Sequence, residues 1–263
     1  MWTKALFGQE KPVIALLHLD PLPGDPGFCG DLEQVVALAE ADSQALISGG
    51  VDGVLIANEF SLPYTDKKAS ETVMAMAYVI GRLKPCLTVP FGVNVVLNPE
   101  ATIRLAAATG AQFGRSAFGG AFAGEYGIHT ADFGTQVRLK YTLGRADMRL
   151  LCKVNPEGDA WLAHRELEDV IDGLCSSGYA DGLCVSGPGA GQEASWETLE
   201  RACRRAGKYR VPVFCNTGCK TSTIRRILSL ADGACVGTAF KNAEGRVDGE
   251  KVKAFMEEAR KQG

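Results

Sequence analysis

The chain of 263 residues is 46% apolar and 22% charged, which is the ordinary composition of a water-soluble globular protein. Its formal net charge of -3, without a basic stripe, argues against nucleic acid as a partner. No segment approaches the ~18–20 apolar residues of a membrane span, and the first residues do not form a signal peptide. We therefore expect a cytoplasmic protein without integral membrane association.

Eight strand-then-helix units follow one another along the chain. Short apolar runs predict strands over 12–19, 53–59, 91–96, 112–118, 149–155, 181–187, 211–217 and 233–239. Between and after them, helical patterns predict helices over 32–48, 67–83, 99–108, 133–143, 166–177, 195–206, 221–230 and 249–261. Asp31 and Ser195 are the expected N-caps of two of these helices. Strict alternation favours a parallel sheet covered by helices.

A weak internal repeat indicates how many strands the sheet has. Gly49–Ile56, Gly178–Val185 and Leu230–Val236 each pass from a helix end through Asp-Gly into an apolar strand, and Thr109–Gly114 is a degenerate copy. The copies precede the second, fourth, sixth and eighth strands, so the repeating unit is a pair of βα modules. Four pairs suit a closed barrel, and we predict an α/β fold with a (β/α)8 TIM barrel as one domain over 1–263.

Two strand ends in the last third of the chain predict a phosphate site. The runs Val211–Gly218 and Asp232–Lys241 both end in small, polar, turn-forming residues. TIM barrels hold phosphate after the seventh and eighth strands, where glycines and a helix start bring N–H groups to the anion. The predicted phosphate-binding residues are Asn216, Thr217, Gly218, Gly237, Thr238 and Lys241, with Ser186, Gly187 and Gly189 from the sixth strand end.

Other polar residues at strand ends are the candidates for catalysis, because barrel active sites lie there. His18, Glu59, Arg115 and Lys153 follow or end the first, second, fourth and fifth strands. Strand alternation places Lys153 in the barrel mouth, unless it forms a structural ion pair across the barrel. Asn94 and Asn155 are the remaining predicted substrate-binding residues.

The roles of these candidates stay open. Arg115 either clamps a phosphate or carboxylate or forms a salt bridge with Glu59 or Asp20. His18 is a general base, a metal ligand or a structural residue, and Glu59 is the best carboxylate for acid–base work.

Cysteines and carboxylates provide no metal signature. The nine cysteines are scattered and often lie inside predicted strands, which predicts buried reduced thiols. They form no zinc pattern, since no second paired cluster accompanies them. A site built from His18, Asp20 and Glu59 has no diagnostic spacing, so we predict no metal, and the cofactor stays unknown.

The segment Phe118–Asp132 predicts a flexible lid. It is a long βα connection with four glycines and several aromatic residues, as a loop that excludes water from a barrel mouth requires. Glu125, His129 and Asp132 would reach the substrate from it. The alternative is an ordered surface loop.

Several separated motifs resemble one known family. Val13–Pro26 (VIALLHLDPLPGDP) is similar to the opening signature of the BtpA/SgcQ family, and Asn58–Tyr64 (NEFSLPY) is similar to its SgcQ-like branch. BtpA-like members usually carry Glu-Asn followed by an Asp in that stretch. Gly92–Val95, Ser186–Gly191 and Gly237–Lys241 resemble later family blocks. The resemblance implies a TIM barrel of the ribulose-phosphate-binding kind, and it links the SgcQ-like branch with sugar-uptake gene clusters and the BtpA-like branch with photosystem I biogenesis.

These observations favour an enzyme that acts on a small phosphorylated sugar or nucleotide-derived metabolite. Aldolase- or isomerase-type proton transfer is the expected chemistry, with a desolvated Lys153 as a base or a Schiff-base nucleophile. The alternatives are a non-catalytic assembly factor of BtpA type, a metal-dependent hydrolase and a flavin-binding barrel. A homo-oligomer is left open.

Overall fold

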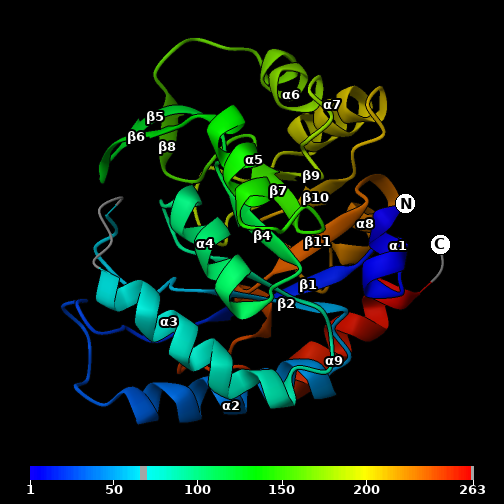
Figure 1. The fold of residues 1–263 in the computed structure, drawn as a ribbon. Coiled ribbons are helices and arrows are strands. Elements are labelled where there is room, and N and C mark those ends of the chain that lie inside the picture. The colour runs from blue at the N-terminus through cyan, green and yellow to red at the C-terminus, as the bar shows by residue number, and fades with distance from the viewer. Residues whose placement is uncertain (66–69, 262–263) are drawn as a thin grey trace.

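The computed structural model describes residues 1–65 and 70–261. Parallel strands close into an eight-stranded barrel (Figure 1), formed by β1 (Val13–His18), β2 (Gly53–Ala57), β3 (Phe91–Asn94), β4 (Phe113–Ser116), β7 (Arg149–Lys153), β9 (Gly182–Val185), β10 (Val213–Cys215) and β11 (Gly233–Val236). Their order around the barrel is β1-β11-β10-β9-β7-β4-β3-β2. Each strand lies within its predicted range, and the predicted TIM barrel is confirmed.

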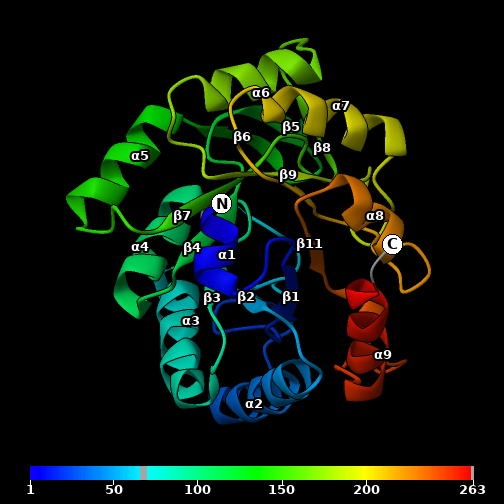
Figure 2. The same cartoon turned by 90° about the vertical axis from the view of Figure 1, so that its right-hand side faces the viewer.

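A ring of helices covers the barrel (Figure 2), formed by α2 (Leu32–Ser48), α3 (Ser70–Leu83), α4 (Pro99–Thr109), α5 (Phe133–Thr142), α6 (Leu167–Cys175), α7 (Trp196–Gly207), α8 (Ile224–Leu230) and α9 (Gly249–Arg260). The 3-10 helices η1 (Lys84–Cys86) and η2 (Thr238–Phe240) complete the connections. Asp31 and Ser195 cap α2 and α7 through their side-chain oxygens, as predicted. The first residues of the predicted helix over 67–83 lie outside the described residues. In the part of the chain that the structure describes, no helix is long and apolar enough to cross a membrane.

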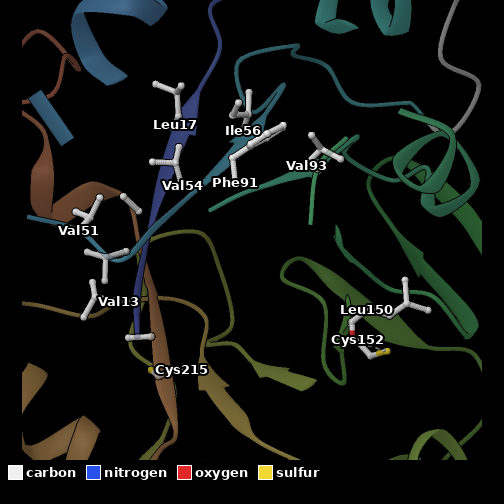
Figure 3. Close-up of a cluster of buried hydrophobic side chains, with 14 of the residues drawn as sticks. Val13, Leu17, Val51, Val54, Ile56, Phe91, Val93, Leu150, Cys152 and Cys215 are labelled. Carbon is white, nitrogen blue, oxygen red and sulfur yellow. Dashed lines mark hydrogen bonds between the residues drawn. The ribbon is translucent and has the colours of Figure 1, made fainter. Parts of the chain in front are cut away.

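The barrel strands are apolar throughout because both of their faces are buried. Their outward side chains, such as Val54, Val93 and Leu150, pack under the helices (Figure 3), and inward ones, such as Leu55 and Leu151, fill the barrel. Each fully buried side chain of this size stabilises the fold by about 1.5–3 kcal/mol relative to exposure. A continuous apolar run, rather than an alternating one, is therefore the pattern that this sheet requires.

The helix α1 (Trp2–Phe7), which the sequence analysis did not predict, closes the amino-terminal end of the barrel. The ring of Phe7 meets that of Phe113 edge-on with centroids 5.5 Å apart, and Trp2 Nε1 donates to the carbonyl oxygen of Asp181 at 2.8 Å. Gly53 makes room for this contact, since an added Cβ would lie 2.7 Å from the Phe7 ring. The interior is thus sealed at this end.

We predict that Phe7→Ala lowers the free energy of unfolding by about 3–5 kcal/mol, because it opens a cavity beneath the barrel. Urea denaturation of the purified protein measures the change. Met74→Ala, at a side chain that is 62% exposed on α3, is the control and should change stability by less than about 0.5 kcal/mol. Equal effects of the two substitutions would contradict a sealing role for α1.

A second, small sheet stands over the other end of the barrel. Its strands β5 (Gly120–Gly124), β6 (Gly127–Ala131) and β8 (Asp159–Trp161) pair antiparallel in the order β6-β5-β8, and in Figure 1 they lie at the opposite end from α1. We call them the cap sheet. The segment 118–132, which we expected to be a loop, contains a β-hairpin instead. Gly127, with φ of +98°, makes the tight turn, and β8 from another connection adds the third strand.

Candidate active site

A cavity of about 420 Å³ opens at the carboxyl ends of the barrel strands, beneath the cap sheet. Most of the predicted site residues line it, namely His18, Glu59, Asn94, Arg115, Lys153, Gly189, Asn216, Thr217, Gly218, Gly237 and Thr238. Glu125 and His129 reach it from the cap sheet. The strand ends thus bring together residues that are as far apart in the sequence as His18 and Thr238.

Four predicted site residues do not line the cavity. Asn155 and Ser186 are bound to each other, with the Asn155 amide donating to the Ser186 carbonyl at 2.7 Å and accepting from its N–H at 3.0 Å. Gly187 donates its N–H to the Thr217 hydroxyl at 2.6 Å. These three residues brace neighbouring strand ends, and the polar atoms that the prediction assigned to a ligand are used within the protein. The fourth residue, Lys241, contacts His18 instead.

Asp132, which was expected to act from the lid, is also outside the cavity. Its carboxylate accepts from the N–H of Thr135 at 2.8 Å and caps α5. His164 is exposed and is not part of the cavity lining.

Glu157 is the central charged residue of the cavity, and the sequence analysis missed it. One of its carboxylate oxygens accepts from Lys153 Nζ at 2.7 Å. The other accepts from the Ser186 hydroxyl at 2.8 Å and from the Asn216 amide at 2.6 Å. Its position four residues after Lys153, just beyond the strand end, was the available signal. Glu157 thus links the ends of three consecutive strands of the barrel.

This network holds Glu157 ionised. Burial alone would raise the pKa of its carboxyl group, but the nearby positive charges of Lys153 and Arg115 outweigh burial and lower the pKa to about 2. Lys153 therefore forms a local ion pair with Glu157, and the alternative of an ion pair across the barrel does not apply. A Schiff-base nucleophile at Lys153 would have to give up this contact.

We predict that Glu157→Gln lowers the free energy of unfolding by roughly 3 kcal/mol near neutral pH, as a shift from 4.5 to about 2 implies. Because the folded-state pKa is depressed, this stability is present above the ordinary value of 4.5 and is lost as the pH falls toward 2. Denaturation curves recorded at several pH values should therefore converge for the two proteins in acid. Glu100→Gln, in an exposed ion pair, is the control, and a pH-independent gap for Glu157→Gln would contradict the argument.

Arg115 is buried on the cavity floor and is held by two amides. Its Nη1 donates to Asn216 Oδ1 at 2.9 Å. The Asn94 amide, oriented so that both of its atoms are satisfied, accepts from Arg115 Nη2 at 3.2 Å and donates to the Arg115 carbonyl at 2.8 Å. Of the alternatives left open for Arg115, a salt bridge to Asp20 does not form, because Asp20 pairs with Arg246 at 2.6 Å. Arg115 is thereby fixed with its charge toward the cavity.

His18 is a neutral imidazole with a defined tautomer. Burial lowers the pKa of His18 to about 4. The charge of Glu59 opposes this shift, and the charges of Lys241 and Arg115 add to it. Lys241 Nζ lies 3.0 Å from His18 Nδ1. An ammonium group only donates hydrogen bonds, so Nδ1 accepts and Nε2 carries the proton.

The protonated Nε2 of His18 faces the predicted phosphate-binding wall. It is buried and makes no hydrogen bond within the described residues, and an ideal Cβ on Gly237 would lie 3.4 Å from it. A metal-ligand role for His18 has no support, since residues 1–65 and 70–261 hold no cluster of three metal-ligating side chains. What His18 offers to a ligand is one N–H donor.

We predict that Lys241→Met raises the pKa of His18 above about 4 while leaving it below the ordinary 6.5, because burial is the larger cause of the shift. The charges that remain around His18 are those of Glu59 and Arg115. Ring nitrogen chemical shifts of His18 followed by NMR against pH measure both the pKa and the tautomer. An unchanged pKa, or a proton on Nδ1 in the unsubstituted protein, would contradict the assignment.

The wall formed by β10 and β11 is built from close-packed glycine turns. Gly218 has φ of +72°, and a Cβ there would lie 2.3 Å from the Cα of Glu193. Gly191 has φ of +73°, and a Cβ added to it would lie 3.2 Å from the Thr238 hydroxyl. Lys220, which the sequence analysis did not select, lines the same wall and pairs with Glu193 at 2.8 Å. The glycine turns at 191 and 218 and the side chain of Lys220 together form this side of the cavity.

The cysteines are free thiols, and those in the barrel strands are buried, as predicted. Cys235 lines the cavity floor, where a hydrogen bond with Cys184 and the charge of Arg115 lower the pKa of its thiol against the effect of burial.

A closed (β/α)8 barrel with a charged cavity at the strand carboxyl ends places the protein among the TIM-barrel proteins. Solved structures agree on the fold: a native KDPGal structure superposes with a TM-score of 0.57 at 14% identity, covering 97% of both chains. Tryptophan synthase from M. tuberculosis gives a TM-score of 0.59 at 14% identity, covering 97% of this chain and 95% of that one. At these identities the likeness shows the fold alone.

The chain belongs to the BtpA family, whose model matches residues 9–261. The sgc region protein SgcQ of Escherichia coli strain K12 is 39% identical over 264 aligned positions, which cover 97% of each chain. The photosystem I biogenesis protein BtpA of Synechocystis is 30% identical over 257 positions, which cover 95% of this chain and 88% of that protein. The family resemblance drawn from the motifs is confirmed.

Proposed function

We propose that the protein is a TIM-barrel enzyme that acts on a small phosphorylated sugar or nucleotide-derived metabolite by proton transfer. The observation that carries this proposal is the shared cavity, in which the four catalytic candidates His18, Glu59, Arg115 and Lys153 face the glycine turns of β10 and β11. Cavities of this size suit a small metabolite. Binding modules need no such convergence of acid, base and cation.

The phosphate would bind to the wall of β10 and β11. Support comes from the glycines at 218 and 237, which let the backbone approach an anion, and from the Thr217 and Thr238 side chains in the lining. The Asn216 amide is already bound to Glu157 and Arg115 and holds this wall in place. Lys220 adds a positive charge at the edge. This arrangement favours a monophosphate group over a carboxylate, because several donors converge from two strand ends.

The proton transfer would use Glu59 as the base and His18 as the electrophile. Glu59 would take the proton from a hydroxyl-bearing carbon beside a carbonyl group; the C–H electron pair then forms the C=C bond of an enediolate as the carbonyl π pair moves onto the oxygen. The Nε2–H of His18 and the charges of Lys153 and Arg115 would stabilise the negative charge on that oxygen. Glu59 would return the proton to the former carbonyl carbon while the hydroxyl proton passes to the enediolate oxygen, so that the carbonyl group reforms on the neighbouring carbon and no atom is gained or lost. The Lys153–Glu157 ion pair favours this course over a Schiff base.

We predict that Glu59→Gln reduces kcat about 10²–10⁴-fold while leaving substrate affinity within a few-fold, as loss of a general base does. Screening the purified protein for thermal stabilisation by sugar phosphates and nucleotides identifies the substrate, and isotope exchange with solvent then measures proton transfer.

Borohydride should trap no adduct on Lys153. Absence of stabilisation by every phosphorylated compound would contradict the proposed function.

An assembly factor is the second candidate, and it rests on the name of the relative BtpA, a photosystem I biogenesis protein. The outer face of the cap sheet carries an exposed apolar side chain, Ile128, which is 64% exposed. Stable co-purification of a partner, combined with no response to phosphorylated ligands, would favour this candidate.

A further inference from the structure

The underside of the cap sheet carries a buried polar pair that the proposed proton transfer does not use. His129 of β6 and Asp159 of β8 both line the cavity, and their side chains are only 9% and 7% exposed. They flank the central strand β5, where His129 is paired with Phe122 and Asp159 with Gly124. An added Cβ on Gly124 would lie 2.2 Å from a carboxylate oxygen of Asp159, so glycine leaves the space that this carboxylate needs.

Within the described residues, the imidazole of His129 is buried and unsatisfied, and the carboxylate of Asp159 lies beside it without a direct hydrogen bond to it. Both ring nitrogens of His129 are buried without a hydrogen-bond partner. His129 Nε2 and Asp159 Oδ1 are 3.9 Å apart, which is too far for a hydrogen bond. Burial raises the pKa of Asp159, in keeping with a carboxylate that has lost water without gaining donors. Unsatisfied buried polar groups that face a cavity indicate a missing ligand group.

A hydroxyl group has the chemistry and the size that this pair requires. It accepts one hydrogen bond and donates another, and so it can serve the imidazole and the carboxylate together. An oxygen about 2.8 Å from each atom would bridge the 3.9 Å gap with an angle of about 90° at the oxygen. A phosphate oxygen would be repelled by Asp159, and an apolar group would leave both side chains unpaired. The pair therefore selects a neutral hydroxyl group.

The position of the pair relative to the phosphate wall sets the size of the ligand. The cap sheet follows β4 and β7, and in the order around the closed barrel β4 stands four places from β11, directly across the mouth. A ligand that holds its phosphate at β10 and β11 must cross the cavity to reach His129. A ligand that makes both contacts therefore extends from the β10 and β11 side to the β4 and β7 side of the mouth, which favours a pentose or hexose phosphate over a three-carbon phosphate.

We propose that His129 and Asp159 form a hydroxyl-binding subsite, which makes the substrate a pentose- or hexose-sized polyhydroxy phosphate. This inference rests on the proposed function for the phosphate end of the ligand only. The apolar face of such a ligand would lie against Phe122, which lines the cavity beside the pair and packs on Trp161 with ring centroids 4.4 Å apart. The cap sheet thus contacts the carbon chain of the ligand and distinguishes ligands by its hydroxyl groups.

Calorimetric titration with chain-matched probes tests the subsite. Inorganic phosphate, n-hexyl phosphate, ribose 5-phosphate, glucose 6-phosphate, glucitol 6-phosphate and free glucitol are titrated into the intact protein. At least one polyhydroxy phosphate should bind about tenfold or more tightly than n-hexyl phosphate. His129→Phe and Asp159→Leu should reduce that preference to about threefold or less, and His129→Gln, which keeps a donor and an acceptor, should retain part of it.

The control is Ile128→Ala, at the exposed neighbour of His129 in the same strand, which should leave the preference unchanged. Unchanged affinity for inorganic phosphate in every variant shows that each one is folded and that the phosphate wall is intact.

The outcomes separate this inference from the proposed function. Phosphate binding without a preference for hydroxyl groups, or a preference that survives both His129→Phe and Asp159→Leu, overturns the subsite and leaves the proposed function standing. Binding of free glucitol that needs His129, in a protein that binds no phosphate, supports the subsite and overturns the proposed function. No binding of any probe overturns both.

Discussion

The carboxylate of Glu157 is the charge on which the organisation of the barrel mouth depends. It is mostly buried, ionised and bound by Lys153, Ser186 and Asn216, so it connects three strand ends through one group. Asn216 in turn fixes Arg115. Contacts within the protein thereby hold the side chains of Lys153, Arg115, Ser186 and Asn216 in place. Because these side chains are already ordered, ordering them costs little free energy when a ligand binds.

The electrostatic design of the cavity separates two kinds of group. On the floor Lys153 is paired with Glu157 and Arg115 is bound by Asn216, while His18 is kept neutral by burial and by the ammonium group of Lys241. A neutral donor beside fixed cations can stabilise a developing oxyanion without competing for the proton that a base removes. The same surroundings that make His18 a poor base therefore make it a suitable hydrogen-bond donor.

The barrel itself was predictable from the sequence, and the details of the mouth were only partly so. Strand positions such as 149–155 follow from apolar runs that any doubly buried strand must have, and alternation placed Lys153 correctly. Helix α1 was missed because six residues carry little periodic signal, and β8 because a three-residue strand depends on its partner β5. The position of Glu157 just after a strand end made it a possible candidate. Its central role and that of Asn155 could not be predicted, since both depend on which atoms the folded chain brings within bonding distance.

The connection after β7 contains both Glu157 and, two residues later, Asp159 at the start of the cap strand β8. One short connection therefore carries both the central carboxylate of the cavity, Glu157, and the first residue of the outer strand of the cap sheet, Asp159. The path of this one connection therefore sets the positions of both carboxylates. A substitution that alters its backbone is expected to disturb the Lys153–Glu157 contact and the pairing of β8 with β5 together.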